Sequence, residues 1–430
     1  MSNIAYTTDP TGAGGATAEE IAQLNSLRPI PRISIHAFCE TESVSRPIER
    51  AAEDRRMSKA HVRVAMGGLE GALGYYATSP TPNLIILESR AEPKELLQSL
   101  ERLAEVCDPS TKVIVVGHYN DVWLYRELLR FGISEYVVAP VSLADIIGNI
   151  SQIFVNPDAQ PLGKTIAFVG AKGGVGSSTI AHNVAWTMST TFSTEVVVAD
   201  LDLPFGTANM NFDQDPAQGI AEAVFSPERI DEVYLDRLLA QCAEHLSLLA
   251  APSTLDRVYD FDADAFAQII DTAQRSAPLL VLDVPHVWNG WTRNTLVEAD
   301  EVVITATPEL ANLRNTKNLV DTLRKLRPND KQPHLIINQA GIPKRPEISP
   351  SDFTEPLGLT PLAIIPFEPQ FFGNAANNGR MLAEMDAQHA IVKTISDIAH
   401  IITGRNEIRT RAKPGITGML DKLRSKKKSS

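Results

Sequence analysis

Apolar and polar positions follow a strand–helix rhythm along the first third of the chain. Short apolar runs, typical of buried strands, are separated by longer stretches with helical spacing of apolar residues. The strand-like runs are Ile33–Phe38, Val62–Ala65, Leu84–Leu87, Val113–Val116 and Tyr136–Val138. The helix-like stretches are Ser45–Asp54, Leu69–Thr78, Lys94–Val106, Val122–Phe131 and Leu143–Phe154. Strands that alternate with helices predict a parallel sheet covered on both faces.

The rhythm resumes after a short segment that contains two prolines. The apolar run Thr165–Val169 precedes a glycine-rich stretch and a helix-like run, Ser178–Met188, and later apolar runs end at acidic residues. We therefore predict an α/β fold with two doubly wound parallel-sheet domains. The expected segments are a disordered N-terminus (1–30), a receiver-like, flavodoxin-like domain (31–155), a linker (156–163), a P-loop nucleotide-binding domain (164–403) and a basic flexible tail (404–430).

The glycine-rich stretch lies between a predicted strand and a predicted helix, which is the setting of a phosphate-binding loop. Its glycines allow successive backbone N–H groups to turn toward an anion, and the helix N-terminus adds a partial positive charge. A glycine-rich turn without a ligand is the alternative, but the length of the match and the acidic segments after it favour a nucleotide. The expected nucleotide-binding residues are Gly173, Gly174, Val175, Gly176, Ser177, Ser178 and Thr179.

Two acidic segments follow the loop. The apolar run that starts at Val196 ends with Asp200 and Asp202, whose side chains point the same way on an extended chain. The run that starts at Leu279 ends with Asp283. Carboxylates at strand ends often only cap the next helix. The order of loop, paired acids and strand-end acid favours a magnesium site instead, with Ser178, Asp200 and Asp283 as metal-site residues.

The loop and the acidic segments together resemble the deviant Walker A ATPases of the ParA/MinD family, over about residues 163–403. In that family the early lysine of the loop reaches across a dimer interface to the partner's nucleotide, so the resemblance implies a catalytic role of this kind for Lys172. It also implies that Asp202 positions the attacking water and that Asp283 is the Walker B carboxylate. The implied cofactors are ATP and Mg²⁺, and the implied assembly is a homodimer.

Two later residues extend the resemblance, and one departs from it. Asn338 resembles the residue that reads the adenine edge, and Pro366 resembles the residue that packs beside the base. Ser177 stands where the family has its P-loop lysine, so one charge on the β/γ-phosphates is missing. Such a loss costs on the order of a few kcal/mol. We expect ATP binding to persist through the backbone, Mg²⁺ and Lys172, and hydrolysis to be slow or absent.

The N-terminal third resembles the receiver domain of response regulators, through the segments 82–88 and 132–140. Receiver chemistry uses an Asp that accepts phosphate, a Thr or Ser switch and a Lys. This chain has Glu88, Gly117 and Ala139 at those positions, and no acidic pair ends the first strand. We expect a receiver fold without phosphotransfer, or a flavodoxin-like domain of other origin. In either case its expected role is docking, since a fold without its site retains only its surfaces.

Charge and composition narrow the expected partners and the expected cellular compartment. The chain carries a formal charge of −12, whereas residues 405–430 hold nine basic residues against two acidic ones. An acidic body makes DNA an unexpected partner. The tail, with one apolar helical face at Ile416–Leu423, is expected either to contact anionic membrane or simply to stay solvated. No signal peptide or membrane span is evident, and three scattered cysteines fit a reducing, cytoplasmic compartment.

A receiver-like domain joined to such an ATPase domain resembles the CpaE/TadZ proteins of Flp/Tad pilus assembly, over roughly residues 31–403. The resemblance implies a dimerising scaffold that localises or assembles the pilus secretion apparatus, often at a cell pole, with its N-terminal domain contacting the machinery. The alternative is an active ParA/MinD-like ATPase that positions division or partition cargo. A DNA-binding regulator is a third class, but no helix-turn-helix segment is found.

Overall fold

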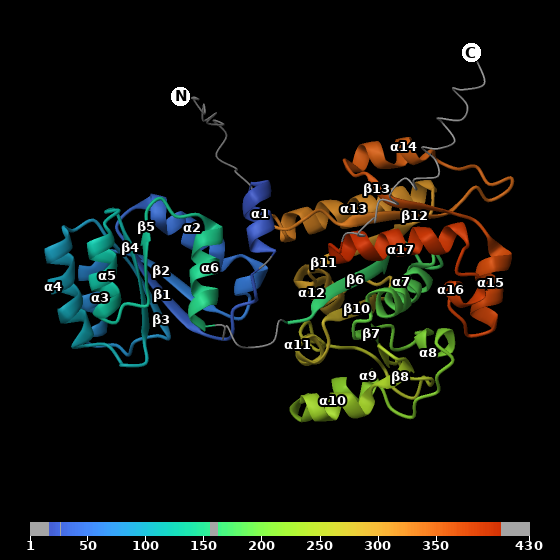
Figure 1. Cartoon of the computed structure of the whole chain (residues 1–430), viewed down its shortest axis with the longest axis horizontal. Coiled ribbons are helices and arrows are strands. Elements are labelled where there is room, and N and C mark those ends of the chain that lie inside the picture. The colour runs from blue at the N-terminus through green and yellow to red at the C-terminus, as the bar shows by residue number, and fades with distance from the viewer. Residues whose placement is uncertain (1–16, 26, 155–161, 406–430) are drawn as a thin grey trace, which may run out of the picture.

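The computed structural model describes residues 17–25, 27–154 and 162–405, so nearly all of the predicted linker and tail lies outside the described residues. The N-terminal part forms a sheet of five parallel strands in the order β2-β1-β3-β4-β5 (Figure 1). This order is that of a doubly wound sheet, which confirms the fold class predicted from the sequence. The strands are β1 (Ser34–Cys39), β2 (His61–Met66), β3 (Leu84–Ser89), β4 (Lys112–Gly117) and β5 (Glu135–Val138).

Helices cover both faces of this small sheet because its strands are apolar on both sides. Along β3, Leu84 and Ile86 pack with one helix layer and Ile85 and Leu87 with the other. The first layer is α2 (Glu42–Ala52) and α6 (Leu143–Phe154). The second layer is α3 (Gly68–Tyr76), α4 (Pro93–Ala104) and α5 (Val122–Arg130), and it faces away from the rest of the molecule (Figure 1).

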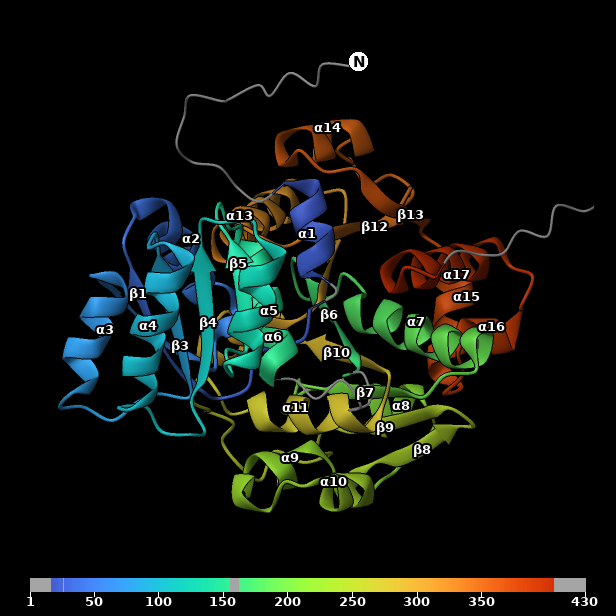
Figure 2. The same ribbon diagram turned by 60° about the vertical axis from the view of Figure 1, so that its left-hand side comes forward.

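The N-terminal segment corrects one prediction. Residues 1–30 were expected to be disordered, yet α1 (Ala18–Leu24) is a helix that contacts α6 and lies near the larger part of the molecule (Figure 2). A capping box forms between Thr17 and Glu20, and Leu24 and Ile30 are fully buried. A helix of seven residues is too short to give a periodic signal in the sequence.

The C-terminal part forms an eight-stranded sheet in the order β13-β12-β11-β6-β10-β7-β9-β8. Its strands are parallel except β8, which runs antiparallel to β9 at the edge. The strands are β6 (Lys164–Gly170), β7 (Val196–Asp200), β8 (Ala240–Ala243), β9 (Leu246–Leu249), β10 (Leu279–Val284), β11 (Glu301–Ala306), β12 (His334–Ala340) and β13 (Pro361–Pro366).

Two helical layers sandwich this large sheet. One contains α7 (Ser177–Phe192), α15 (Pro369–Asn377), α16 (Leu382–Met385) and α17 (Ala390–Thr403), and the short α8 (Ala208–Asn211) joins it. The other contains α9 (Ile220–Val224), α10 (Glu232–Leu238), α11 (Ala267–Ser276), α12 (Gly290–Glu298), α13 (Leu310–Leu326) and α14 (Pro350–Thr354). The described residues also include the short 3₁₀ turns η1 (Arg55–Met57), η2 (Pro227–Arg229) and η3 (Glu355–Leu357). Within the described residues, no helix combines the length and apolarity needed to cross a bilayer.

A buried ion-pair network joins the two sheets. Arg55 and Arg56, on η1 of the small domain, both bind Asp330, which lies between α13 and β12 of the large domain. The distances from guanidinium nitrogen to carboxylate oxygen are 3.0–3.1 Å, and the Asp330 side chain is 2% exposed. Burial by itself raises the pKa of Asp330, but the guanidinium groups around it outweigh burial and hold that pKa below its usual value.

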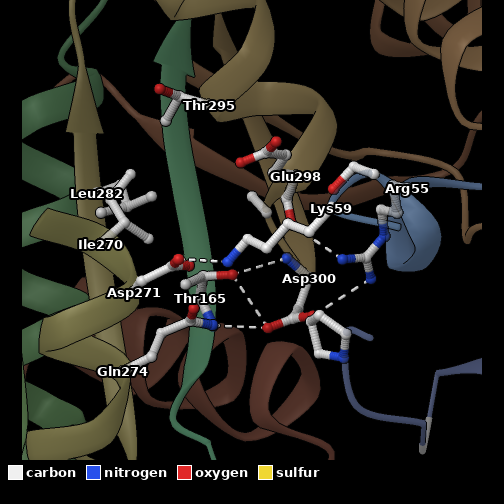
Figure 3. A pocket seen from close by; sticks show the side chains of 13 residues that line it. Arg55, Lys59, Thr165, Ile270, Asp271, Gln274, Leu282, Thr295, Glu298 and Asp300 are labelled. Atoms are coloured by element: carbon white, nitrogen blue, oxygen red, sulfur yellow. Dashed lines mark hydrogen bonds and ion pairs between the residues drawn. The ribbon is translucent and has the colours of Figure 1, made fainter. Parts of the chain in front are cut away.

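The network, which we call the interdomain clasp, extends beyond Asp330. Arg55 also donates to the carbonyl oxygen of Glu298 at 2.9 Å and to Asp300 Oδ1 at 3.2 Å, and Lys59 pairs with Asp271. Figure 3 shows Arg55 and Lys59 reaching toward these large-domain acids. Asp300 directly precedes β11, so the clasp lies at the amino ends of the strands. The carboxyl ends, where ligands of such sheets bind, remain uncovered by it.

The clasp predicts a large stability effect from a single buried carboxylate. Asp330→Asn keeps the side-chain shape but leaves buried guanidinium groups without their anion. We expect the free energy of unfolding of the full chain to fall by about 3–5 kcal/mol, measured by urea denaturation. Asp321→Asn is the control, because that carboxylate pairs with Lys317 on the exposed face of α13 and should give no resolvable change. Equal effects of the two substitutions would refute a special role for the clasp.

Candidate nucleotide-binding site

The predicted phosphate-binding loop lies between the carboxyl end of β6 and the start of α7. Gly174 and Gly176 have φ angles of 81° and 85°, in the left-handed region that favours glycine. A Cβ on Gly176 would lie 2.6 Å from Asn338 Nδ2, whereas Cβ atoms on Gly173 or Gly174 would meet no described atom within 4 Å. The loop therefore has one packed side and one open side, as a cradle for an anion requires.

The two serines that open α7 differ in their surroundings. Ser178 Oγ donates to Asp283 Oδ1 at 3.2 Å, so the hydroxyl and the strand-end carboxylate predicted for the metal site lie together. Ser177 is buried, and its Oγ has no hydrogen-bond partner among the described residues. Buried hydroxyls usually have such a partner, so a bound group could supply it at this position. It is also the position where a lysine would have supplied a charge.

Two carboxylates are buried beside each other at the ends of neighbouring strands. Asp200 and Asp283 are paired across β7 and β10 and are 1% and 4% exposed. Burial, and then the neighbouring charge of Asp283, raise the pKa of Asp200 to about 7. Asp200 also accepts hydrogen bonds from the backbone amides of Asp202 and Ala208, each at 3.1 Å. Excess negative charge in a buried site favours an additional cation.

Asp202 lies in the loop that follows β7. Its Oδ1 accepts from the amide of Phe205 at 3.2 Å, and burial is the main cause that raises its pKa. The structure therefore brings Ser178, Asp200 and Asp283 together at the carboxyl edge of the large sheet. Asp202 lies on the segment that follows β7. No group of three or more His, Cys, Asp or Glu side chains in the described residues has the arrangement of a metal site made by protein alone. Mg²⁺ usually takes few protein ligands and completes its shell with phosphate and water.

The predicted base-binding residues line one cavity next to the loop. Thr179, Asn338 and Pro366 surround a cavity of about 170 Å³, together with the aromatic Phe367 and Phe372. Asn338 Nδ2 donates to the carbonyl oxygen of Val175 at 2.8 Å. The amide nitrogen thus supports the loop, which is a role that sequence reasoning missed. The size and lining of the cavity fit a planar heterocycle.

Lys172 points away from the core of its own loop. Its side chain is 54% exposed, and its Nζ lies 3.8 Å from Glu309 Oε2, which makes a loose ion pair. Large apolar side chains are exposed around this edge, after β7, β10 and β11; they are Phe205, Val287, Trp288 and Leu310. A cation within an apolar rim is suited to contact another molecule rather than its own chain.

The donor set fits ATP and Mg²⁺ as a whole. Ser178 and Asp283 would hold the metal ion, the open loop would hold the phosphates, and the cavity beside Asn338 would hold the base. Glu309 and His182 also belong to the site but were not identified from the sequence. Neither lies in a motif: Glu309 follows β11, and His182 is an internal residue of α7.

Comparison with known proteins agrees with this geometry. A family model described as an AAA domain matches residues 163–337. The septum site-determining protein MinD of Synechocystis is 24% identical over 163 residues, which are 38% of this chain and 60% of that protein. The chain thus spans less than two thirds of this curated relative. The structure of MinD from Pyrococcus horikoshii, complexed with Mg-ADP, is 17% identical, with a TM-score of 0.50, and covers 56% of this chain and 96% of its own. At this identity it shows the fold alone.

The pilus assembly protein CpaE from Caulobacter crescentus has a higher sequence identity. Its solved chain is 47% identical to this one, covers 30% of it and is itself 98% covered, with a TM-score of 0.30. The identity over almost the whole of that chain, rather than the superposition, decides the family. This chain belongs to the CpaE family of pilus assembly proteins. Its larger sheet has the fold of the MinD-like ATPases.

The small domain of this CpaE family member holds Glu88 where receivers carry their phosphate acceptor. Glu88 is fully buried at the end of β3. Its Oε2 accepts from the amides of Glu40 and Thr41 at 2.7 and 2.8 Å, and its Oε1 accepts from Thr41 Oγ1 at 2.6 Å and lies 3.1 Å from His118 Nε2. A carboxylate saturated with internal donors is a poor nucleophile, which supports the expectation that the domain does not transfer phosphate.

The same contacts predict a pH-dependent stability. Burial raises the pKa of Glu88, but the hydrogen bonds from Thr41, Glu40 and His118 outweigh it and lower that pKa below the ordinary 4.5. A depressed folded-state pKa stabilises the fold above the unfolded value, and this contribution is lost as pH falls through the folded value. Glu88→Gln should therefore cost about 1.5–3 kcal/mol at pH 7, and the difference from wild type should shrink below pH 4.5.

Urea denaturation of both proteins across pH 3–8 measures this difference. Glu70→Gln is the control, because Glu70 is exposed and pairs with Arg102 at the surface. A Glu88→Gln cost that stays constant down to pH 3 would contradict the proposed charge of Glu88.

Proposed function

We propose that this chain is an ATP-binding, dimerising scaffold that localises or assembles the Flp/Tad pilus secretion apparatus, with weak or no ATP hydrolysis. The observation that carries the proposal is the pairing of an open phosphate cradle with Ser177 in place of a lysine. The cradle supports binding, because backbone N–H groups and the helix N-terminus remain available. The missing charge works against turnover, because developing charge on the transferred phosphoryl group lacks one of its usual partners.

Dimerisation is supported by the surface around Lys172. Phe205 and Leu310 are each 73% exposed, and Trp288 is 51% exposed, at the same edge of the sheet as the loop. Apolar side chains that rim a nucleotide site favour burial against a second copy, and a nucleotide shared between copies stabilises only the associated state. Association would then depend on the bound nucleotide, which is how a scaffold can be switched.

The clasp bears on the role of the small domain. Because it lies at the opposite edge of the large sheet, two chains that meet at their nucleotide sites would still present both small domains. We propose that these domains contact the pilus machinery in the cytoplasm, at the inner face of the membrane. The segment 406–430, for which we predicted possible contact with anionic lipid, lies outside the described residues.

An active ATPase that positions division or partition cargo is the competing function. One observation favours it: Asp200, Asp202 and Asp283 lie near one another beside the loop. Three carboxylates are more than nucleotide binding alone needs. Single-turnover hydrolysis of bound ATP, measured beside the ATP affinity, separates the two. Turnover on the scale of a few per minute or faster would refute the scaffold reading.

Lys172→Ala should separate association from nucleotide binding. Because Lys172 is exposed and only loosely paired with Glu309, its removal should weaken ATP-dependent dimerisation by about tenfold while changing the ATP affinity of the monomer much less. Sedimentation at several protein concentrations and nucleotide titration measure the two quantities. Equal losses in both would mean that Lys172 acts on the phosphates of its own chain. Lys317→Ala, a surface lysine of α13, is the control.

Ser177→Lys restores the missing charge at the start of α7. We expect the ATP affinity to rise by about tenfold, because a charge-assisted contact to a phosphate becomes available in a partly buried loop. Hydrolysis should rise with it if the missing charge alone keeps the site slow. Unchanged affinity, measured by calorimetric titration, would show that the position does not face the phosphates.

A further inference from the structure

A buried histidine lies directly behind the strand-end carboxylate of the proposed metal site. His182, on α7, is fully buried, and its Nε2 is 3.1 Å from Asp283 Oδ2. The two atoms lie within hydrogen-bond reach, but their angle does not make a hydrogen bond, and Nε2 has no other partner in the part of the chain that the structure describes. The other oxygen of the same carboxylate accepts from Ser178 at 3.2 Å. Asp283 thus lies between a hydroxyl on one side and an imidazole on the other.

The contact at His182 Nδ1 determines whether His182 Nε2 carries a proton. Asn211 Nδ2 lies 2.9 Å from His182 Nδ1 and donates to it. A neutral imidazole that accepts at Nδ1 carries its proton on Nε2. That proton points to the side of Asp283. The ring is held further by Phe212, whose centroid lies 5.3 Å away.

Asn211 connects this contact to the segment after β7. It is the last residue of α8, and the amide of Ala208, the first residue of α8, donates to Asp200 Oδ2 at 3.1 Å. Both ends of α8 are therefore tied to the buried acids, one end directly and the other through His182. The exposed side chain of Met210 lies between these two attachments.

We propose that His182 is a positioning residue, which holds the Asp283 carboxylate in the orientation for Mg²⁺ and links that carboxylate to α8 through Asn211. The inference rests on the proposed binding of Mg²⁺-nucleotide. A packing role alone would not need a polar ring with one nitrogen tied to an amide and the other placed against a carboxylate. Residues that orient a metal ligand without touching the metal affect binding measurably. Their loss typically costs about 10–100-fold in metal affinity.

The test compares nucleotide affinity with and without Mg²⁺ in the full chain. ADP is titrated by calorimetry in the presence of Mg²⁺ or of EDTA, for wild type, His182→Leu, His182→Gln and Asn211→Leu. His182→Leu should reduce the tightening by Mg²⁺ about tenfold and leave the affinity in EDTA unchanged. His182→Gln keeps an N–H donor at a similar reach and should restore most of the loss. Asn211→Leu keeps the volume, frees the tautomer and should give a smaller loss of the same kind.

Two controls separate positioning from packing. Thr187→Val is a buried change further along α7 and should leave both affinities as in wild type. Nitrogen-15 NMR of the wild-type ring should show the proton of His182 on Nε2, and this signature should weaken in Asn211→Leu. Equal losses with Mg²⁺ and with EDTA, or no loss in either, would overturn the role of His182. A wild type that binds no nucleotide would refute the proposed function itself, together with this role.

Discussion

The architecture depends on one buried carboxylate, Asp330, and the two guanidinium groups that neutralise it. Taking these charges out of water is costly, and their attraction repays it only while the geometry is kept. Arg55 and Arg56 approach from the small domain, so any other placement of the two domains would leave these charges without their partners. The interface therefore specifies how the two domains sit against each other. It fixes the small domain at the amino edge of the large sheet and leaves the carboxyl edge, with the phosphate loop, accessible.

Much of the fold was predictable because it follows local patterns. Every strand predicted in the small domain lies within two residues of its observed ends, and the alternation with helices gave the parallel sheet. The clasp was not predictable in this way. Asp330 lies some 275 positions from Arg55, and isolated arginines and aspartates in a sequence are usually solvated. The helix α1 was missed for a related reason, because its stability comes from contact with α6 and not from its own seven residues.

The candidate site shows the same difference between local patterns, which the sequence reveals, and tertiary contacts, which it does not. The loop and the strand-end acids were predicted from motifs, which are local backbone requirements, and Asn338 and Pro366 were predicted from the family resemblance; their roles toward a ligand stay predictions. The contacts that support them are tertiary. Asn338 donates to the loop carbonyl of Val175, and His182 lies against Asp283. The spacing of residues in the sequence predicts neither contact. What a motif gives is the set of atoms that can touch a ligand, whereas their orientation is decided by side chains from elsewhere in the fold.

Two sites in this chain depart from their catalytic relatives in opposite electrostatic ways. In the small domain, four internal donors surround the Glu88 carboxylate and favour its charged form, so the negative charge at this position is already satisfied within the domain. In the large domain, Ser177 stands where the resembled ATPases have a positive charge, and its buried hydroxyl has no hydrogen-bond partner among the described residues. If the proposed function holds, the first change fixes a conformation, and the second keeps a binding site while weakening the means to empty it by hydrolysis. The proposal therefore describes a protein that holds a state rather than one that cycles through states.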